Sequence, residues 1–142
     1  ADDRERDPHE FVPEESRRAR AVPVYAVLRT LGRDGLRRLV EGNCAQARRM
    51  AERLAVHPAV RILNEVVLNQ VLVRFDDGRG DADGLTRAVV AGVQKEGTCW
   101  LGGTRWHGLD AMRISLSNWS TTDRDVDLSA DAILRVLEAA RS

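Results

Sequence analysis

The chain has 142 residues, which is the length of one domain or of a part of a larger protein. Its 22 basic and 22 acidic residues give a formal net charge of zero, and 43% of its residues are hydrophobic. This charge balance argues against an electrostatic nucleic-acid surface, and no apolar run approaches the roughly 20 residues that span a bilayer. We therefore expect neither a nucleic-acid partner nor a membrane partner.

The cysteines and histidines indicate the cellular compartment and whether a metal site is expected. Cys44 and Cys99 are the only cysteines, and we expect both to be buried free thiols. Residues 1–10 are charged and carry no signal-peptide pattern, so a cytoplasmic location is predicted. The three histidines are scattered along the chain, and no metal site is expected.

The N-terminal part of the chain predicts two helices. Residues 1–10 are expected to form a loop, and Pro13 suits the first turn of a helix that ends at Gly32. Pro23 lies inside this helix and is expected to kink it or split it. A second helix is predicted for residues 34–55, where apolar residues recur at helical spacing.

The remainder of the chain alternates between strand and helix signals. The predicted elements are strands at 60–63 and 70–75, a helix at 83–95, strands at 98–105 and 111–117, and a helix at 123–141. Gly97 is expected to end the first of these helices. Thr122 is expected to cap the last one, with Asp125 completing a capping box.

This order of elements favours one fold class. Long alternating strand–helix–strand units are absent, which argues against a parallel sheet. We predict an α+β fold: a small, largely antiparallel sheet with helices on one face, preceded by two helices.

One predicted strand places an arginine on a polar face. Side chains alternate along a strand, so Met112 and Ile114 share one face, while Arg113 and Ser115 share the other. A guanidinium in mid-strand needs a partner or water, and its planar fork suits a carboxylate ligand. Arg113 is therefore our candidate for substrate binding, with a structural ion pair as the alternative.

Three further residues lie on the neighbouring predicted strand. Gly102, Gly103 and Thr104 either let a ligand approach the backbone or mark a bulge. With Ser115, we interpret them as candidate cleft-lining residues, and we assign no catalytic residue. The tryptophans are interpreted as packing residues in preference to a cleft mouth; they are Trp100, Trp106 and Trp119.

Two stretches of the sequence carry a family resemblance. The first is Pro13-Glu14-Glu15-Ser16-Arg17-Arg18-Ala19-Arg20, continuing through Pro23-Val24-Tyr25-Ala26 to Leu28-Arg29-Thr30-Leu31-Gly32. The second is Met112-Arg113-Ile114-Ser115 with Asn118-Trp119 and Thr121-Thr122. Over residues 11–140, the chain resembles the C-terminal portion of group II pyridoxal-phosphate-dependent decarboxylases, which include aromatic-L-amino-acid, glutamate and diaminobutyrate decarboxylases.

The resemblance implies a fold, a reaction and a partner. The implied fold is the C-terminal small domain of the aspartate aminotransferase-like enzymes. Residues 1–32 would then be a loop and the last helix of a large domain, and residues 33–142 the small domain. The implied parent is a homodimeric carboxy-lyase that uses pyridoxal 5'-phosphate to convert an amino-acid substrate to an amine. Several members have an arginine at the position of Arg113, near the substrate carboxylate.

One departure from the family concerns the cofactor. The family binds pyridoxal phosphate through a lysine that follows a histidine in the large domain. The single lysine here, Lys95, follows Gln94 and does not match that motif. We therefore assign no cofactor-binding residue and expect this chain to be inactive alone, with the cofactor bound in a longer parent. The alternative is a free-standing α+β ligand-binding or regulatory module without a cofactor.

Overall fold

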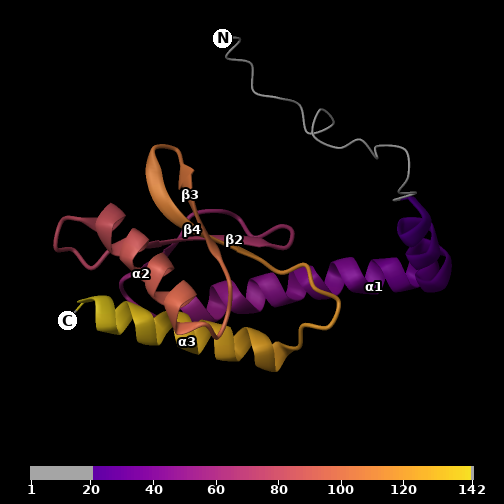
Figure 1. The fold of residues 1–142 in the computed structure, drawn as a ribbon. Coiled ribbons are helices and arrows are strands. Elements are labelled where there is room, and N and C mark those ends of the chain that lie inside the picture. The colour runs from indigo at the N-terminus through magenta and orange to yellow at the C-terminus, as the bar shows by residue number, and fades with distance from the viewer. Residues whose placement is uncertain (1–20, 142) are drawn as a thin grey trace, which may run out of the picture. The chain divides into compact units, whose positions relative to one another are not determined.

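The computed structural model describes residues 21–141. Their elements, in order, are α1 (Ala21–Ala55), β1 (Val60–Ile62), β2 (Gln70–Phe75), α2 (Ala82–Glu96), β3 (Gly102–Trp106), β4 (Leu109–Ser115) and α3 (Asp123–Arg141) (Figure 1). The predicted helix start at Pro13 and the first part of the family-like sequence lie outside the described residues.

The chain divides into two compact units after Arg37, and the break in α1 belongs to the first of them. The only non-helical backbone inside α1 is at Gly32, with φ 61° and ψ −172°, a conformation that is essentially restricted to glycine. The predicted helix end at Gly32 is confirmed. Pro23 is the third described residue of α1, and the residues before Ala21 lie outside the described part, so the break expected at Pro23 stays a prediction.

The second unit contains a four-stranded sheet of order β1-β2-β4-β3 in which every neighbouring pair is antiparallel. β3 and β4 are joined by His107 and Gly108, which have φ values of 47° and 82°. Two consecutive residues with positive φ are typical of a two-residue hairpin, and Trp106 pairs with Leu109 across it. The predicted α+β class and antiparallel sheet are confirmed.

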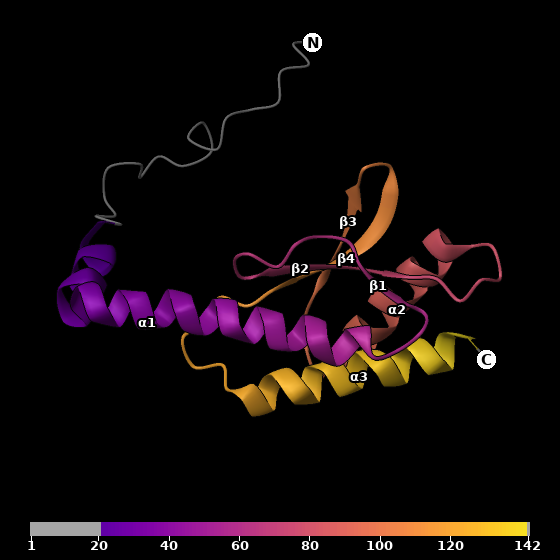
Figure 2. The same cartoon turned by 180° about the vertical axis from the view of Figure 1, so that it is seen from behind.

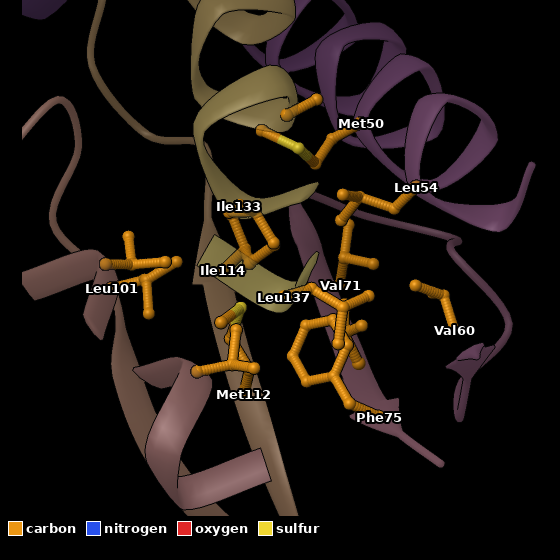
Figure 3. Close-up of a cluster of buried hydrophobic side chains, with 14 of the residues drawn as sticks. Met50, Leu54, Val60, Val71, Phe75, Leu101, Met112, Ile114, Ile133 and Leu137 are labelled. Atoms are coloured by element: carbon orange, nitrogen blue, oxygen red, sulfur yellow. The ribbon is translucent and has the colours of Figure 1, made fainter. Parts of the chain in front are cut away.

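The hydrophobic core lies between this sheet and the helices of the second unit. It combines sheet residues with α1, α2 and α3 residues; the largest fully buried members are Phe75, Met50, Leu54, Met112, Ile133 and Leu137 (Figure 3). Met112 and Ile114 belong to this cluster, so β4 presents its apolar face to the helices. The helices therefore cover one face of the sheet, as predicted.

Local hydrogen bonds define the ends of two helices. Gly97 ends α2 in the left-handed conformation with φ 87°, and its N–H donates to the Val93 carbonyl. At the start of α3, the Thr122 N–H donates to Asp125 Oδ2 at 2.8 Å, and the Asp125 N–H donates to Thr122 Oγ1 at 3.3 Å. This reciprocal pair is the predicted capping box.

The C-terminal half of α1 lies beside α3 (Figures 1 and 2). Arg49 donates to both carboxylate oxygens of Asp127 at 2.8 and 2.7 Å. One turn further along both helices, Arg53 donates to Asp131. These charge-assisted bonds connect two helices that frame the core.

Candidate functional site

Arg113 lies on the sheet face opposite the helices. Across the sheet it is flanked by Leu72 of β2 and Gly102 of β3. The side chain is exposed, and none of residues 21–141 forms a hydrogen bond or ion pair with it. Gly102 places no side chain over the guanidinium. The group is therefore open to an external anion or to water on this side of the sheet.

Four of the five predicted site residues share this face, which we call the polar sheet face: Gly102, Thr104, Arg113 and Ser115. Ser115 pairs with Gln70, whose amide nitrogen donates to the Ser115 hydroxyl at 3.4 Å. Gly103 is directly opposite Met112 and so belongs to the helix side of the sheet. In the sheet, Gly103 therefore faces the opposite side from the other four residues.

Gly103 and Thr104 line a groove between β3 and α2, which we call the α2–β3 groove. It has a volume of about 360 Å³ and is lined by Thr86, Arg87, Val90, Ala91, Gln94, Gly103, Thr104, Asp110 and Ala111. The sequence alone does not predict that α2 and Asp110 help to line this groove. No local motif marks them, because the groove exists only where α2 crosses the β3–β4 hairpin.

A network of charges closes one end of this groove. Asp110 pairs with Arg87 through its carboxylate, and its backbone carbonyl accepts from Arg74 at 3.0 Å. Asp83 pairs with Arg74 and also accepts from the Asp110 N–H at 3.1 Å. The hydrogen bond from Arg74, with that of the Asp110 N–H, lowers the pKa of Asp83 from its ordinary value. The Asp83 carboxylate is therefore held as an anion that stabilises the network and is poorly suited to act as a base near neutral pH.

Lys95 does not fit the role of a cofactor lysine. It is exposed in the last turn of α2, between Gln94 and Glu96. It lines neither the α2–β3 groove nor a second cavity of about 180 Å³ beside Cys99 and Ser115. Formation of an imine with pyridoxal phosphate needs an amine beside a pocket that holds the ring and phosphate. Lys95 therefore lacks the surroundings that a cofactor lysine needs.

The burial of the cysteine and tryptophan side chains differs in part from what the sequence predicts. Both cysteines are free, and Cys44 is buried, but Cys99 is only partly buried and precedes β3. Burial raises the pKa of the Cys99 thiol from its ordinary value, which disfavours the reactive thiolate. The packing interpretation is wrong for Trp100 and Trp119, which are 80% and 81% exposed. Both indoles lie on loops that precede or follow the hairpin, outside the core cluster.

The described residues offer neither a metal-binding cluster nor a membrane-spanning helix. No group of three or more histidine, cysteine, aspartate or glutamate side chains within residues 21–141 is arranged to hold a metal ion. In the same part of the chain, no helix combines the length and the apolar character needed to cross a membrane.

Comparison with known proteins identifies the fold. No family model matches the sequence, and no curated protein does either. Catharanthus roseus tryptophan decarboxylase in complex with L-tryptophan matches with a TM-score of 0.76 and 15% identity, over 82% of this chain and 25% of that one. Oryza sativa TDC with PLP and tryptamine matches with a TM-score of 0.77 and 16% identity, over 84% and 27%.

A bacterial structure gives a similar result. The glutamate decarboxylase domain of diaminobutyrate-pyruvate transaminase and L-2,4-diaminobutyrate decarboxylase from Vibrio parahaemolyticus matches with a TM-score of 0.70 and 22% identity. The match covers 82% of this chain and 25% of that one. At such identities the likeness shows the fold alone. This chain therefore spans about a quarter of the length of each of these proteins and shares the fold of that part.

Proposed function

We propose that this chain is the C-terminal small domain, with its connecting helix, of a pyridoxal-phosphate-dependent amino-acid decarboxylase. The observation that carries the proposal is the fold likeness to decarboxylases, with a TM-score of 0.76 over 82% of this chain for the tryptophan enzyme. The two family-like stretches, residues 13–32 and 112–122, support the same assignment. In this proposal residues 1–32 belong to a large domain and residues 33–142 to the small domain.

Arg113 is the residue through which this domain would contact an amino-acid substrate. Its guanidinium is exposed on the polar sheet face and can donate two parallel hydrogen bonds to a carboxylate. An ionic bond that held the departing carboxylate strongly in the ground state would raise the barrier to decarboxylation. We therefore propose that Arg113 binds a side-chain acid of the substrate or stabilises the closed position of the domain, with Gly102, Thr104 and Ser115, which share its sheet face, as the cleft wall.

The cofactor and the second subunit complete the proposed enzyme. Pyridoxal phosphate bound in the parent would supply the electron sink that amino-acid decarboxylation needs. Because Lys95 does not fit that cofactor, the binding lysine would come from the large domain of the parent. The proposed parent is a cytoplasmic homodimer, and residues 1–142 alone would bind neither cofactor nor substrate productively.

An activity assay tests this assignment. The full-length parent and the 142-residue chain are each incubated with pyridoxal phosphate and with L-tryptophan, L-glutamate or L-2,4-diaminobutyrate, and amine formation is measured. We expect the parent to form an amine from at least one amino acid, only with the cofactor, and the 142-residue chain to form none. Amine formation by the isolated chain, or a parent that is inactive with the whole amino-acid panel, would contradict the proposal.

A second candidate function is supported by the self-contained core. Residues 38–142 enclose their own hydrophobic cluster, as a free-standing ligand-binding or regulatory module would. The two candidate functions predict different protein sequences upstream of these residues. A decarboxylase parent encodes a histidine-lysine cofactor motif upstream of these residues, whereas a free-standing module does not.

A further inference from the structure

β3 forms one edge of the sheet and offers unused backbone hydrogen-bonding groups. The two-residue hairpin makes Trp106 and Leu109 a hydrogen-bonded pair, and such pairs alternate along an antiparallel ladder. Gly103 and Arg105 therefore point their N–H and C=O groups away from β4. Nothing in residues 21–141 forms a backbone hydrogen bond to these four groups.

The α2–β3 groove lies directly beside this edge. Val90 and Gln94 line it from α2, and they are one helical turn apart. Gly103 has no side chain to fill the space; a Cβ at this position would lie 4.0 Å from Val90 Cγ1, which is ordinary contact. A strand added beside β3 would point alternate side chains into the groove. This combination of a free strand edge and an adjacent groove is the geometry of peptide recognition by β-strand addition.

The charges at the end of the groove favour an acidic occupant. Arg87 pairs with one carboxylate oxygen of Asp110, and Arg105 pairs with the other. Their side chains are 62% and 69% exposed, whereas that of Asp110 is 17% exposed. Adding the Arg74–Asp83 pair, three guanidinium groups face two carboxylates, so this end carries a charge of +1. The exposed charge that a ligand meets is therefore positive.

We propose that the β3 edge and the α2–β3 groove bind an extended, acidic segment of a partner protein, which adds a strand to the sheet. The backbone of the segment would pair with Gly103 and Arg105. Its apolar side chains would enter the groove beside Val90, and its carboxylates would approach Arg87 and Arg105. This interaction does not depend on the proposed decarboxylase activity.

Two labelled peptides test the proposal on the 142-residue chain. Both are acetylated, amidated seven-residue peptides in which the valine and the charged residues share one face of the strand: TVTETET carries glutamates, and TVTKTKT carries lysines in the same positions. Fluorescence anisotropy should give a Kd in the millimolar range or below for the glutamate peptide, and about 10-fold weaker binding for the lysine peptide. Added salt should weaken the binding of the glutamate peptide.

Two neighbouring glycines provide a matched pair of variants. Gly103→Val fills the groove and should weaken binding of the glutamate peptide about 10-fold or more, whereas Gly102→Val adds the same side chain on the polar sheet face and should not. Neither glycine has a positive φ, so valine fits both backbones. Circular dichroism of both variants checks that the fold is retained.

Several results would overturn the proposal. Equal affinity for the two peptides would remove the argument from charge, and the absence of binding at millimolar peptide would remove the site. Equal loss in both glycine variants would place the peptide elsewhere. Peptide-free dimerisation that Gly103→Val abolishes would show that the edge pairs with a second copy of this chain instead.

Discussion

Adjacent side chains of β4 lie in opposite environments. Met112 is fully buried and Ile114 is 6% exposed in the core, whereas Arg113 and Ser115 are exposed on the polar sheet face. The reason is the two-residue repeat of a strand combined with helices on one side only. Substitutions of neighbouring residues should therefore affect different properties of the protein.

Ile114→Ala should destabilise the fold. Truncation of a buried aliphatic side chain removes apolar contacts and leaves a cavity, which costs about 2–5 kcal/mol of unfolding free energy. Ser115→Ala is the matched control, because its exposed hydroxyl has only a 3.4 Å bond from Gln70, and it should change stability by less than about 0.5 kcal/mol. Urea unfolding of both variants measures the difference. If Ser115→Ala proved the more damaging change, the two faces of β4 would be assigned the wrong way round.

At the scale of the element, most helices and strands follow from local signals in the sequence. Gly97 ends α2 and the Thr122–Asp125 pair begins α3, because these residues satisfy backbone groups within a few positions of themselves. β3 begins at Gly102, four residues after its predicted start at Thr98. Thr98 instead bonds to Glu96, and Gln94 donates to the Leu101 carbonyl, so local bonds hold residues 98–101 outside the ladder.

The candidate site was less predictable than the elements. The alternation around Arg113 is a property of one strand and could be read directly. The separation of Gly103 from Gly102 and Thr104 could not, because it depends on which residue of β3 pairs with Met112. The groove required the position of α2 over the hairpin, and its acidic residue, Asp110, carries no sequence signal for that contact.

The ion pairs that α3 forms with Arg49 of α1 and with His57 should make stability depend on pH. The hydrogen bond from Arg49 lowers the pKa of Asp127, and that from His57 lowers the pKa of Glu138. A carboxyl with a lowered folded-state pKa adds stability above its unfolded-state pKa, and the stability is lost as pH falls through the folded-state value. Unfolding free energy should therefore fall on acidification below about pH 4.

Asp127→Asn isolates the contribution of one carboxylate. The variant should be less stable than wild type at pH 7, and its stability should change less between pH 7 and strongly acidic conditions. Denaturant unfolding across the pH range supplies the comparison. Parallel profiles for wild type and Asp127→Asn would show that this ion pair is energetically unimportant.

At the scale of the whole molecule, the second unit has its own core, whereas the helix of the first unit exposes apolar side chains. The exposed residues in this helix are Val22, Val24, Tyr25, Val27, Leu28 and Leu31. Such a run favours burial against another surface. The 142-residue chain should therefore self-associate as its concentration rises, and residues 38–142 should be monomeric and unfold cooperatively.

Sedimentation velocity of the two lengths tests this expectation. The shorter chain keeps the core residues of α1, including Met50 and Leu54, so its folding is a direct control. A 142-residue chain that stays monomeric at every concentration would contradict the prediction. So would a shorter chain that fails to fold, because the core would then depend on residues 1–37.

The most direct test of the proposed function is the effect of Arg113→Met on catalysis by the full-length parent. We predict a fall in kcat/KM of about 10-fold or more, equivalent to about 1.4 kcal/mol of transition-state stabilisation, with the unfolding free energy unchanged. Arg48→Met, the same change on an exposed position of α1, should leave both quantities unchanged. If kcat/KM is the same in Arg113→Met and wild type, Arg113 has no substrate role and the proposed site on the polar sheet face is wrong.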